Sequence, residues 1–421
     1  MENRMIESRF LFVKSIWEGS NEMVKEVLRK DGTKKKARYL LYSVNPGEGF
    51  NLRRDVYMRV ANLVHKLNEK EHWILVLPPW AGIYHWHNDR GSGSISPWSF
   101  FFDILSLSKW VPVMEYHEWA EKRDGEFIFV SFVFLRYSMG WFSTWRTQYE
   151  PCRPHIDHTG GWESASGWQA WLWGSHLHVG NFSCLSVQGQ AQTLLPLIEE
   201  QNGRSILFGR AETVLHDEYG GNWYWSARRS MRFAKHLKKE ADQFRAKYLD
   251  SDDQRDKTEV EDDWRDTKKR HDSAIGGPYL GVHLRRQDFL HARGDQVPSL
   301  KLAAKQISKL LVGHNIDNVF IATDAPDVEF SDLKGYLEGY NVWRYKPNPE
   351  FQNNWGDGGV AIVDQIICSH ARYFIGSYES TFSFRIQEER EILGFSTKSS
   401  FNRLCGKKKP CEQPSKWTIV Y

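Results

Sequence analysis

The order of strand, loop, helix and strand within residues 38–77 constrains the fold most. An apolar run at 38–44 ends at an Asn-Pro-Gly break at 45–47, which predicts a strand followed by a turn. From about 52 to 67 the apolar residues recur every three or four positions, which predicts a helix. A second apolar run, 73–77, stops at a Pro-Pro pair. Strand, loop, helix and strand in this order predict an α/β fold with a doubly wound sheet.

The same order returns in the last third of the chain. The predicted strands are 279–284, 319–322 and 373–375, and the predicted helices are 300–312 and 380–393. Ser380 or Thr381 is placed to cap the last helix. Two α/β regions therefore predict two Rossmann-like domains that face a central cleft, the GT-B type of fold.

A stretch dense in charges of both signs, 250–273, separates the two α/β regions and is interpreted as a solvated linker or helix, acidic pairs included. The predicted organisation is an N-terminal extension at 1–37, a first domain at 38–248, a linker at 249–276 and a second domain at 277–421.

The net charge and the hydropathy of the chain argue against nucleic-acid binding and against a membrane span. The net charge of +3 over 421 residues argues against nucleic-acid binding, because such domains are usually strongly basic. No run approaches the roughly 20 consecutive apolar residues that span a bilayer, so we expect no membrane span. We expect the chain to act as a monomer.

The cysteines and one sequon bear on the cellular compartment. We expect disulfides between Cys152 and Cys184 and between Cys405 and Cys411, with Cys368 a buried thiol. The sequence also allows other pairings, and in a cytosolic protein all five cysteines could be free thiols. Asn181 begins an Asn-Phe-Ser sequon, which matters only in the secretory pathway. The first 37 residues carry no signal peptide, so we expect that the biological start differs from the one shown.

The first candidate cluster is the Asn-Pro-Gly-Glu-Gly-Phe-Asn segment at 45–51. It leaves the carboxyl end of a predicted strand and enters a helix, which is where open α/β sheets bind ligands. Its glycines let the backbone approach a ligand, and the following N–H groups can hold phosphate. An ordinary strand-to-helix turn explains the pattern as well. Glu48, a carboxylate between two glycines, is well placed to accept a proton.

The second cluster places Arg285 and Arg286 at the end of an apolar strand. Charge is costly there unless an anion meets it, and the planar guanidinium binds two phosphate oxygens at once. The alternative is an ion pair with Asp288 or another acid.

The third cluster comprises Asp364, Ser380 and Thr381. Asp364 lies within an apolar helix and is either a structural acid or a partner for the N–H groups of a guanine edge. The two hydroxyl residues offer hydroxyls and amides to phosphate, although a plain helix cap explains them equally.

Metal binding is not expected. Three histidine pairs, His85 with His87, His155 with His158 and His176 with His178, have no third ligand at recognisable spacing. The only Asp-x-Asp, at 250–252, lies in the charged stretch.

Seven stretches in the same order resemble the protein O-fucosyltransferases, most closely those that modify thrombospondin type 1 repeats. They are RYLLYSVNPGEGFNLRRDVY, WILVLPPW with YHW after it, CLSVQG, GGPYLGVHLRRQDF, VFIATDA, DGGVAIVDQIIC and STFSFRIQEEREILG. With the cysteine-bearing tail they cover most of 38–421, whereas 125–178 matches loosely and 1–37 does not match. The resemblance implies a GT-B fold, GDP-fucose as donor, no metal, inversion at the anomeric carbon, a lumenal location in the endoplasmic reticulum and a folded acceptor with a Cys-x-x-Ser/Thr-Cys motif.

Position by position, the resemblance implies roles for individual residues. Glu48 would be the general base, and Arg285 would hold the β-phosphate. The positions that match the donor pocket are Gly49, Phe50, Asn51, Ser380, Thr381 and Phe382, those near the guanine are His283 and Asp364, and Asp288 would face the acceptor.

Two other functions stay open. One is a fucosyltransferase with another acceptor, such as epidermal-growth-factor-like repeats or a glycan, and the Arg-Arg-Gln-Asp form of 285–288 argues against it. The other is a non-catalytic folding-assistance protein of the same fold, and the presence of both Glu48 and Arg285 argues against that.

Overall fold

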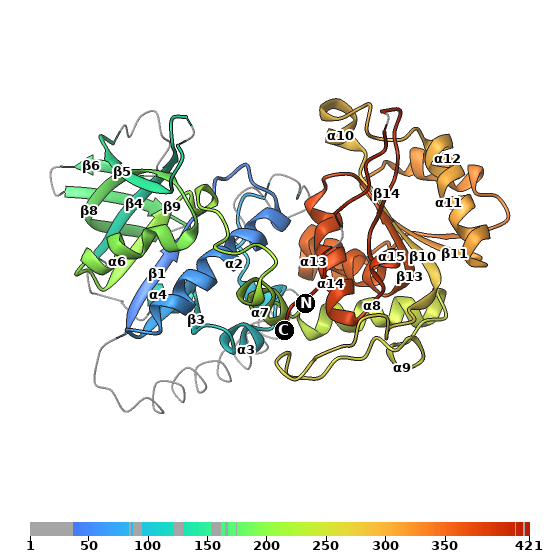
Figure 1. The fold of residues 1–421 in the computed structure, drawn as a ribbon, viewed down its shortest axis with the longest axis horizontal. Helices are drawn as coiled ribbons and strands as arrows, with labels where there is room; N and C mark the ends of the chain where they lie inside the picture. Colours follow the sequence, from blue (N-terminus) through green and yellow to red (C-terminus); the bar gives the residue numbers. More distant parts are fainter. Residues whose placement is uncertain are drawn as a thin grey trace, which may run out of the picture.

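The computed structural model describes residues 37–421 except 84–85, 87–94, 122–128, 141, 153–160, 165–166, 174, 409 and 416. The chain forms two α/β halves that lie side by side, each around its own sheet (Figure 1). Three helices lie where the two halves meet, namely α2 (Phe50–Leu67), α13 (Pro349–Ser369) and α14 (Thr381–Leu393) (Figure 1).

The first sheet has the order β3-β2-β1-β9-β4-β8-β7-β6, with β5 paired to β8. Its strands are β1 (Arg38–Tyr42), β2 (Trp73–Leu77), β3 (Val113–Glu115), β4 (Phe129–Tyr137), β5 (Arg146–Glu150), β6 (Gly161–Ser164), β7 (Gly167–Leu172), β8 (Ser175–Gln188) and β9 (Ser205–Gly209). The pairings among β1, β2, β3, β9, β4 and β8 are parallel, and those of β5, β6 and β7 are antiparallel. The central strands are buried on both faces, which is why they read as continuous apolar runs.

Helices and short 3-10 turns follow these strands along the chain. They are α2 (Phe50–Leu67), η1 (Trp98–Phe100), α3 (Ile104–Ser108), α4 (Tyr116–Glu121), η2 (Ala191–Leu194), α6 (Leu195–Glu200), η3 (Ala211–Thr213), α7 (Asn222–Ser230), α8 (Lys235–Tyr248) and α9 (Asp253–Asp256). Most of them pack in the first half, whereas α8 packs against α13 of the second half (Figure 1).

The second sheet is parallel throughout and has the order β12-β11-β10-β13-β14. Its strands are β10 (Gly277–Leu284), β11 (Asn318–Thr323), β12 (Asn341–Trp343), β13 (Ala371–Gly376) and β14 (Asn402–Arg403). The helices of this half are α10 (Gln287–Ala292), α11 (Leu300–His314), α12 (Asp327–Tyr336), α13 (Pro349–Ser369), α14 (Thr381–Leu393) and α15 (Thr397–Ser400). The α/β class and the elements predicted in both halves are therefore confirmed.

One boundary matters for the site, because α2 begins at Phe50, two residues before the predicted start. Gly49 has an extended backbone (φ −75°, ψ 166°) and occupies the cap position without a side-chain cap bond. The N–H groups of the first helical turn, which have no partner within the helix, therefore begin two residues after Glu48.

The interpretation of 250–273 as solvated is wrong for part of the stretch, which is buried, while the rest is exposed. Trp264 is 4% exposed, and its indole N–H donates to the carbonyl oxygen of Ser106 at 3.1 Å. Asp253 pairs with Arg245 at 2.8 Å and with Lys238 at 2.9 Å. A run of charged residues is exposed when water solvates the charges. Here basic side chains of α8 pair with Asp253 instead.

A buried ionic network joins the two halves between α7 and α14. Arg228 Nε lies 2.6 Å from Glu388 Oε2, and its Nη2 lies 2.8 Å from Glu389 Oε2. The Tyr224 hydroxyl donates to Glu388 Oε1 at 2.5 Å. Because a buried charge left alone is costly, these pairs favour one arrangement of the two halves.

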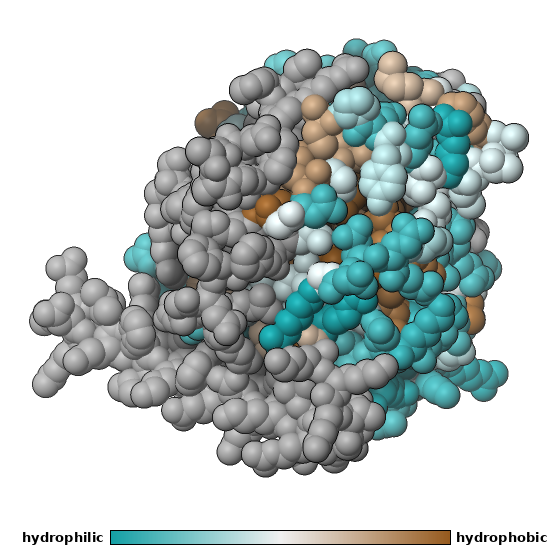
Figure 2. Space-filling model, turned by 90° about the vertical axis from the view of Figure 1, so that its left-hand side faces the viewer, coloured by the Kyte–Doolittle hydropathy of each residue, from teal (hydrophilic) through white to brown (hydrophobic). Residues whose placement is uncertain are grey.

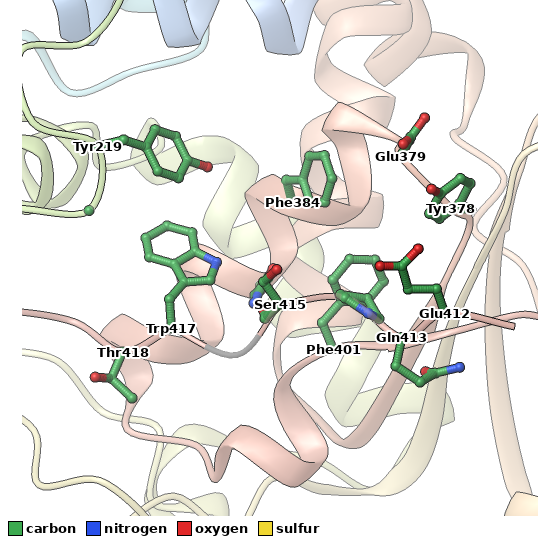
Figure 3. Close-up of a pocket in the computed structure, with 13 residues that line it drawn as sticks. Tyr219, Tyr378, Glu379, Phe384, Phe401, Glu412, Gln413, Ser415, Trp417 and Thr418 are labelled. Atoms are coloured by element: carbon green, nitrogen blue, oxygen red, sulfur yellow. Dashed lines mark hydrogen bonds between the residues drawn. The ribbon is translucent and has the colours of Figure 1, made fainter. Parts of the chain in front are cut away.

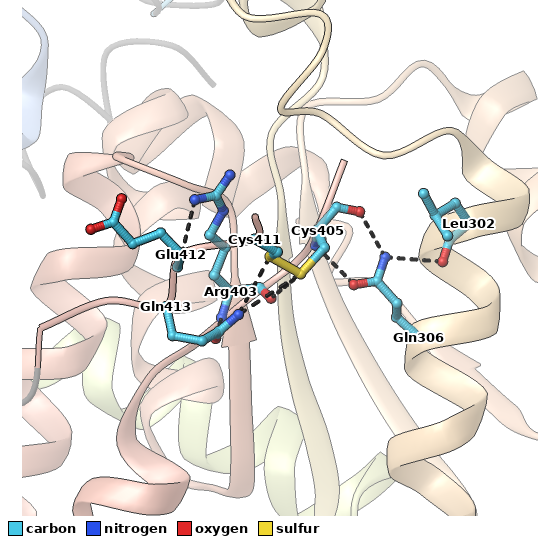
Figure 4. Close-up of a disulfide and its surroundings, with 7 residues drawn as sticks. All are labelled: Leu302, Gln306, Arg403, Cys405, Cys411, Glu412 and Gln413. Carbon is cyan, nitrogen blue, oxygen red and sulfur yellow. Dashed lines mark hydrogen bonds between the residues drawn. A yellow bond between two sulfur atoms is a disulfide. The ribbon is translucent and has the colours of Figure 1, made fainter. Parts of the chain in front are cut away.

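Both expected disulfides form, and Cys368 is a buried free thiol. The Cys152–Cys184 bond ties the chain after β5 to β8. The Cys405–Cys411 bond closes a loop that Gln306 of α11 also holds, because its side chain accepts from the Cys405 N–H and donates to the Cys405 carbonyl oxygen (Figure 4). No described helix is both long and apolar enough to cross a membrane.

Candidate active site

Glu48 lies in the loop between β1 and α2, at the carboxyl end of a central strand. Its N–H donates to the Asn45 carbonyl oxygen at 2.9 Å, and its own carbonyl oxygen accepts from Arg53 Nε at 3.0 Å. Arg53 also donates to the Ala81 carbonyl oxygen at 2.9 Å. The loop is therefore held from both sides while the Glu48 side chain stays half-buried.

The proton affinity of Glu48 is raised. Burial raises its pKa first and the neighbouring charge of Glu212 adds to the rise, while a hydrogen bond from Asn45 and the charges of Arg53 and Arg210 act in the opposite direction. Glu212 is buried beside the loop, where it accepts from the Asn45 N–H at 3.2 Å and pairs with Arg210 at 3.2 Å. A half-buried carboxylate with raised pKa is suited to take a proton from a hydroxyl.

The first turn of α2 is tied to the second half of the molecule. The side-chain amide of Gln365, on α13, donates to Asn51 Oδ1 at 2.9 Å and accepts from the buried Arg54 at 2.7 Å. The Phe50 ring is 4% exposed and packs against Trp80 at 4.8 Å between ring centres. Phe50 can therefore reach a ligand only with its backbone.

Arg285 and its neighbours occupy the carboxyl end of β10. The Arg285 guanidinium lies 2.8 Å from Asp288 and 3.3 Å from Asp324, and its backbone N–H donates to the Ser377 hydroxyl at 2.8 Å. The ion pair with Asp288, the alternative considered from the sequence, is thus present. Arg285 keeps 21% of its side chain exposed, so an anion can still reach it.

Arg286 has a different environment from Arg285. It is 7% exposed, pairs with Glu329 at 2.8 Å and donates to the Pro298 carbonyl oxygen at 3.0 Å. These contacts tie the end of β10 to α12 and to Pro298 before α11. Arg285 is therefore the arginine of the pair that is open to a ligand.

His283, two residues before Arg285 in β10, contacts the first turn of α14. Its Nδ1 lies 2.8 Å from the Ser383 hydroxyl, and its ring stacks on Phe382 at 4.3 Å. Burial, and then the Arg285 charge, lower its pKa to about 3, so the ring is neutral at physiological pH. A Cβ on Gly376 would lie 2.5 Å from the Ser383 oxygen, so this close approach of β13 requires glycine.

The N-terminus of α14 is open in the same region. Ser380 occupies the cap position, 6% exposed, but its side chain makes no cap bond, and Thr381 is exposed. Glu379, just before them, has a positive φ of 46°. Uncapped N–H groups at the start of a 13-residue helix suit a phosphate.

A pocket of about 610 Å³ runs along the flank of α14 (Figure 3). Tyr219 lines it from the first half of the chain, and Tyr378 and Glu379 line it from the loop before Ser380, with Trp417 from the C-terminal tail. The loop that precedes the open helix end therefore borders free space.

Asp364 is the one candidate that the sequence could not distinguish from a structural acid. Its Oδ1 is buried and has no hydrogen-bond partner among the described groups. Burial raises its pKa to about 8, and the Arg344 charge only partly opposes this rise. A buried carboxylate oxygen without a donor is the arrangement that a ligand with N–H groups would complete.

Sequence reasoning missed Glu212 and Asp324, which set the charge around Glu48 and Arg285. Asp324 ends β11 as Arg285 ends β10, and neighbouring parallel strands place such ends together, so that signal was present. Glu212 carried no local signal. Among the described residues no group of three or more His, Cys, Asp and Glu side chains could hold a metal ion. The residues 85, 87, 155 and 158 lie outside the described residues.

A family model and several known proteins match most of the chain. The family described as GDP-fucose protein O-fucosyltransferase matches residues 39–393. GDP-fucose protein O-fucosyltransferase 2 of Homo sapiens is 47% identical over 93% of this chain and 91% of its own length, and that of Caenorhabditis elegans is 46% identical over 91% and 90%.

Solved structures show the same fold. The crystal structure of POFUT1 in complex with GDP matches 88% of this chain and 99% of its own, with a TM-score of 0.55 and 16% sequence identity. The apo form matches with a TM-score of 0.53 and 13% identity. The fold is thus of the GT-B type, and the chain belongs to the GDP-fucose protein O-fucosyltransferase family of glycosyltransferases.

Proposed function

We propose that the chain transfers L-fucose from GDP-fucose to a Ser or Thr hydroxyl of folded thrombospondin type 1 repeats, with inversion at the anomeric carbon. The observation that carries the proposal is Glu48, a half-buried carboxylate of raised pKa at the start of α2, in a chain of this family. The names of the relatives support the donor and the protein acceptor.

In the proposed reaction Glu48 takes the proton of the acceptor hydroxyl while that oxygen attacks the fucose carbon from the face opposite GDP. The bond between this carbon and the β-phosphate oxygen breaks, and GDP leaves with the negative charge. Arg285, together with the open N-terminus of α14, stabilises that charge. Neutralisation by these groups makes a metal unnecessary in this proposal.

The donor contacts follow from the same arrangement. Ser380, Thr381 and the backbone of Phe382 would hold the phosphates, and the neutral His283 and Asp364 would face the guanine. Gly49, Phe50 and Asn51 would close the pocket from the α2 side, and Asp288, which is 40% exposed, would lie toward the acceptor.

The endoplasmic reticulum lumen is the location that we propose. Two disulfides and the exposed side chain of Asn181 in its sequon support it, because both features belong to an oxidising, secretory compartment.

The test is transfer of labelled fucose from GDP-fucose to a folded thrombospondin type 1 repeat, run with and without excess EDTA. We expect transfer to the folded repeat, none to the reduced and unfolded repeat, and full activity in EDTA. No transfer by an enzyme that still binds GDP would overturn the acceptor, and full inhibition by EDTA would overturn the metal-free reaction.

Glu212→Gln should move the acid limb of the pH–rate profile to lower pH. Glu48 must be deprotonated to act, so a raised pKa means that activity falls, as pH decreases, at a higher pH than for an ordinary glutamate. Removing the Glu212 charge removes one of the two causes that raise that pKa, so the pKa falls.

The measurement for this prediction is kcat/KM as a function of pH, which reports groups of the free enzyme. Glu338→Gln, at an exposed position after α12, is the matched control and should leave the profile unchanged. An acid limb that stays in place in Glu212→Gln contradicts Glu48 as the base.

Asp364→Asn should weaken GDP binding about 10- to 150-fold, the range for losing hydrogen bonds to a charged group. The variant should keep or raise the Tm of the free protein, because it removes an acid that burial holds at a raised pKa. Because the pKa of Asp364 is about 8, this carboxyl group must lose a proton when the wild type binds GDP. The GDP affinity of the wild type should therefore rise from pH 6 to pH 8, whereas that of the variant should not change. Calorimetry at several pH values measures both. Unchanged affinity with a lowered Tm would identify a structural acid.

A further inference from the structure

Exposed apolar side chains gather on the connection between β4 and β5 and on the facing loop after η3. We call Tyr137, Met139, Phe142, Trp145 and Leu215 the hairpin surface; their exposed fractions are 58%, 88%, 37%, 49% and 42%. Figure 2 shows the side of the molecule that carries the first sheet, where apolar residues are exposed among hydrophilic ones. Single exposed apolar residues are ordinary, whereas five on one connection and its neighbour indicate a binding surface.

The hairpin surface is a structured part of the fold. Tyr137 and Leu215 line a common hollow of about 300 Å³, together with Gln188 of β8. The Gln188 side chain holds the connection, because it accepts from the Phe142 N–H at 2.9 Å and donates to the Phe142 carbonyl oxygen at 2.8 Å. The guanidinium of Arg146 lies over the Phe142 ring. These contacts hold the backbone and the ring of Phe142 in place before a partner binds.

The hairpin surface adjoins the candidate base. The Tyr137 hydroxyl donates to the Glu212 carbonyl oxygen at 3.4 Å, and the Glu212 carboxylate accepts from the Asn45 N–H at 3.2 Å. Asn45 in turn accepts from the Glu48 N–H at 2.9 Å. Burial and then the Glu212 charge raise the pKa of Tyr137, and the Glu48 charge adds to this rise. A molecule that places a hydroxyl at Glu48 therefore meets the hairpin surface beside it.

We propose that the hairpin surface is where the protein acceptor docks, through an apolar patch next to its reactive hydroxyl. This inference rests on the proposed function. An acceptor whose hydroxyl lies at Glu48 must be a macromolecule to reach over this surface as well. Aromatic and methionine side chains are also enriched where proteins bind one another. The surface lies within 125–178 and its neighbouring loop, whereas the groups proposed to contact the phosphates and the guanine lie on the second half. It would thus set acceptor affinity without touching the donor.

The test compares Met139→Asp and Trp145→Ala with Val312→Asp, an exposed position on α11 that is 72% exposed. We expect KM for the folded acceptor repeat to rise about tenfold in each hairpin variant, the loss that one interface contact of about 1.4 kcal/mol produces. GDP affinity, Tm and kcat at saturating acceptor should stay as in the wild type, and Val312→Asp should change nothing. KM within twofold of wild type in both hairpin variants, or an equal rise in Val312→Asp, overturns the proposal.

Direct binding separates this proposal from the proposed function. The folded repeat is passed over immobilised enzyme in the presence of GDP, and its Kd is compared between wild type and Trp145→Ala. Binding that Trp145→Ala weakens, without transfer by the wild type, supports the hairpin surface and overturns the activity. Transfer by wild type with equal KM and Kd in all variants supports the activity and overturns the surface. A wild type that neither binds nor modifies the repeat overturns both.

Discussion

Glu48→Gln is expected to lower kcat for fucose transfer about 100- to 10,000-fold, the usual contribution of a positioned general base. Glutamine keeps the shape of the side chain but cannot take the proton of the acceptor hydroxyl. The loop geometry should persist, because the neighbouring backbone bonds to Asn45 and Arg53 do not involve the carboxylate. Glu48→Ala should have the same effect on transfer.

GDP affinity distinguishes the base from a donor-binding group. The carboxylate acts on the acceptor, so calorimetry should give a Kd for GDP within about twofold of the wild type, a difference of less than 0.5 kcal/mol. Glu338→Gln serves again as the matched exposed control. A Glu48 variant that loses GDP affinity would remove Glu48 from the acceptor side and with it the proposed mechanism.

Arg285→Ala is expected to weaken GDP-fucose binding about 10- to 150-fold, as for the loss of hydrogen bonds to a charged group. The loss in kcat should be larger, about 100- to 1,000-fold, because the charge on GDP is greatest as the sugar leaves. The substitution also leaves Asp288 and Asp324 without the arginine that neutralises them, and two free carboxylates would repel a diphosphate. Arg285→Lys should recover little, since an ammonium lacks the planar pair of donors.

A matched control for Arg285 is available on α9. Arg255 also pairs with two acids, Asp250 and Asp252, but lies at an exposed position. Arg255→Ala should leave donor affinity and kcat unchanged. Normal donor binding and turnover by Arg285→Ala would show that this arginine only neutralises its two acids.

Much of the fold could be predicted from the sequence because the signals are local. The apolar period at 38–77 predicts β1, α2 and β2, since burial of one helix face and of a central strand leaves a repeat that can be counted. The two disulfides were paired correctly, and one of them closes a short loop between Cys405 and Cys411. Arg285 could be recognised as a charge at the end of an apolar strand, and Glu48 as a carboxylate between two glycines in the loop after a strand.

The tertiary structure alone decided what surrounds those charges. Glu212 stands 164 positions after Glu48 in the chain and Gln365 stands 314 positions after Asn51, so no local pattern links them. The same holds for Trp264, which is buried although its neighbours are charged. Burial and the distance between charges depend on which surfaces the fold brings together. The sequence therefore determined the elements and the chemical groups of the site, and the packing of the two halves determined their protonation, their partners and their exposure.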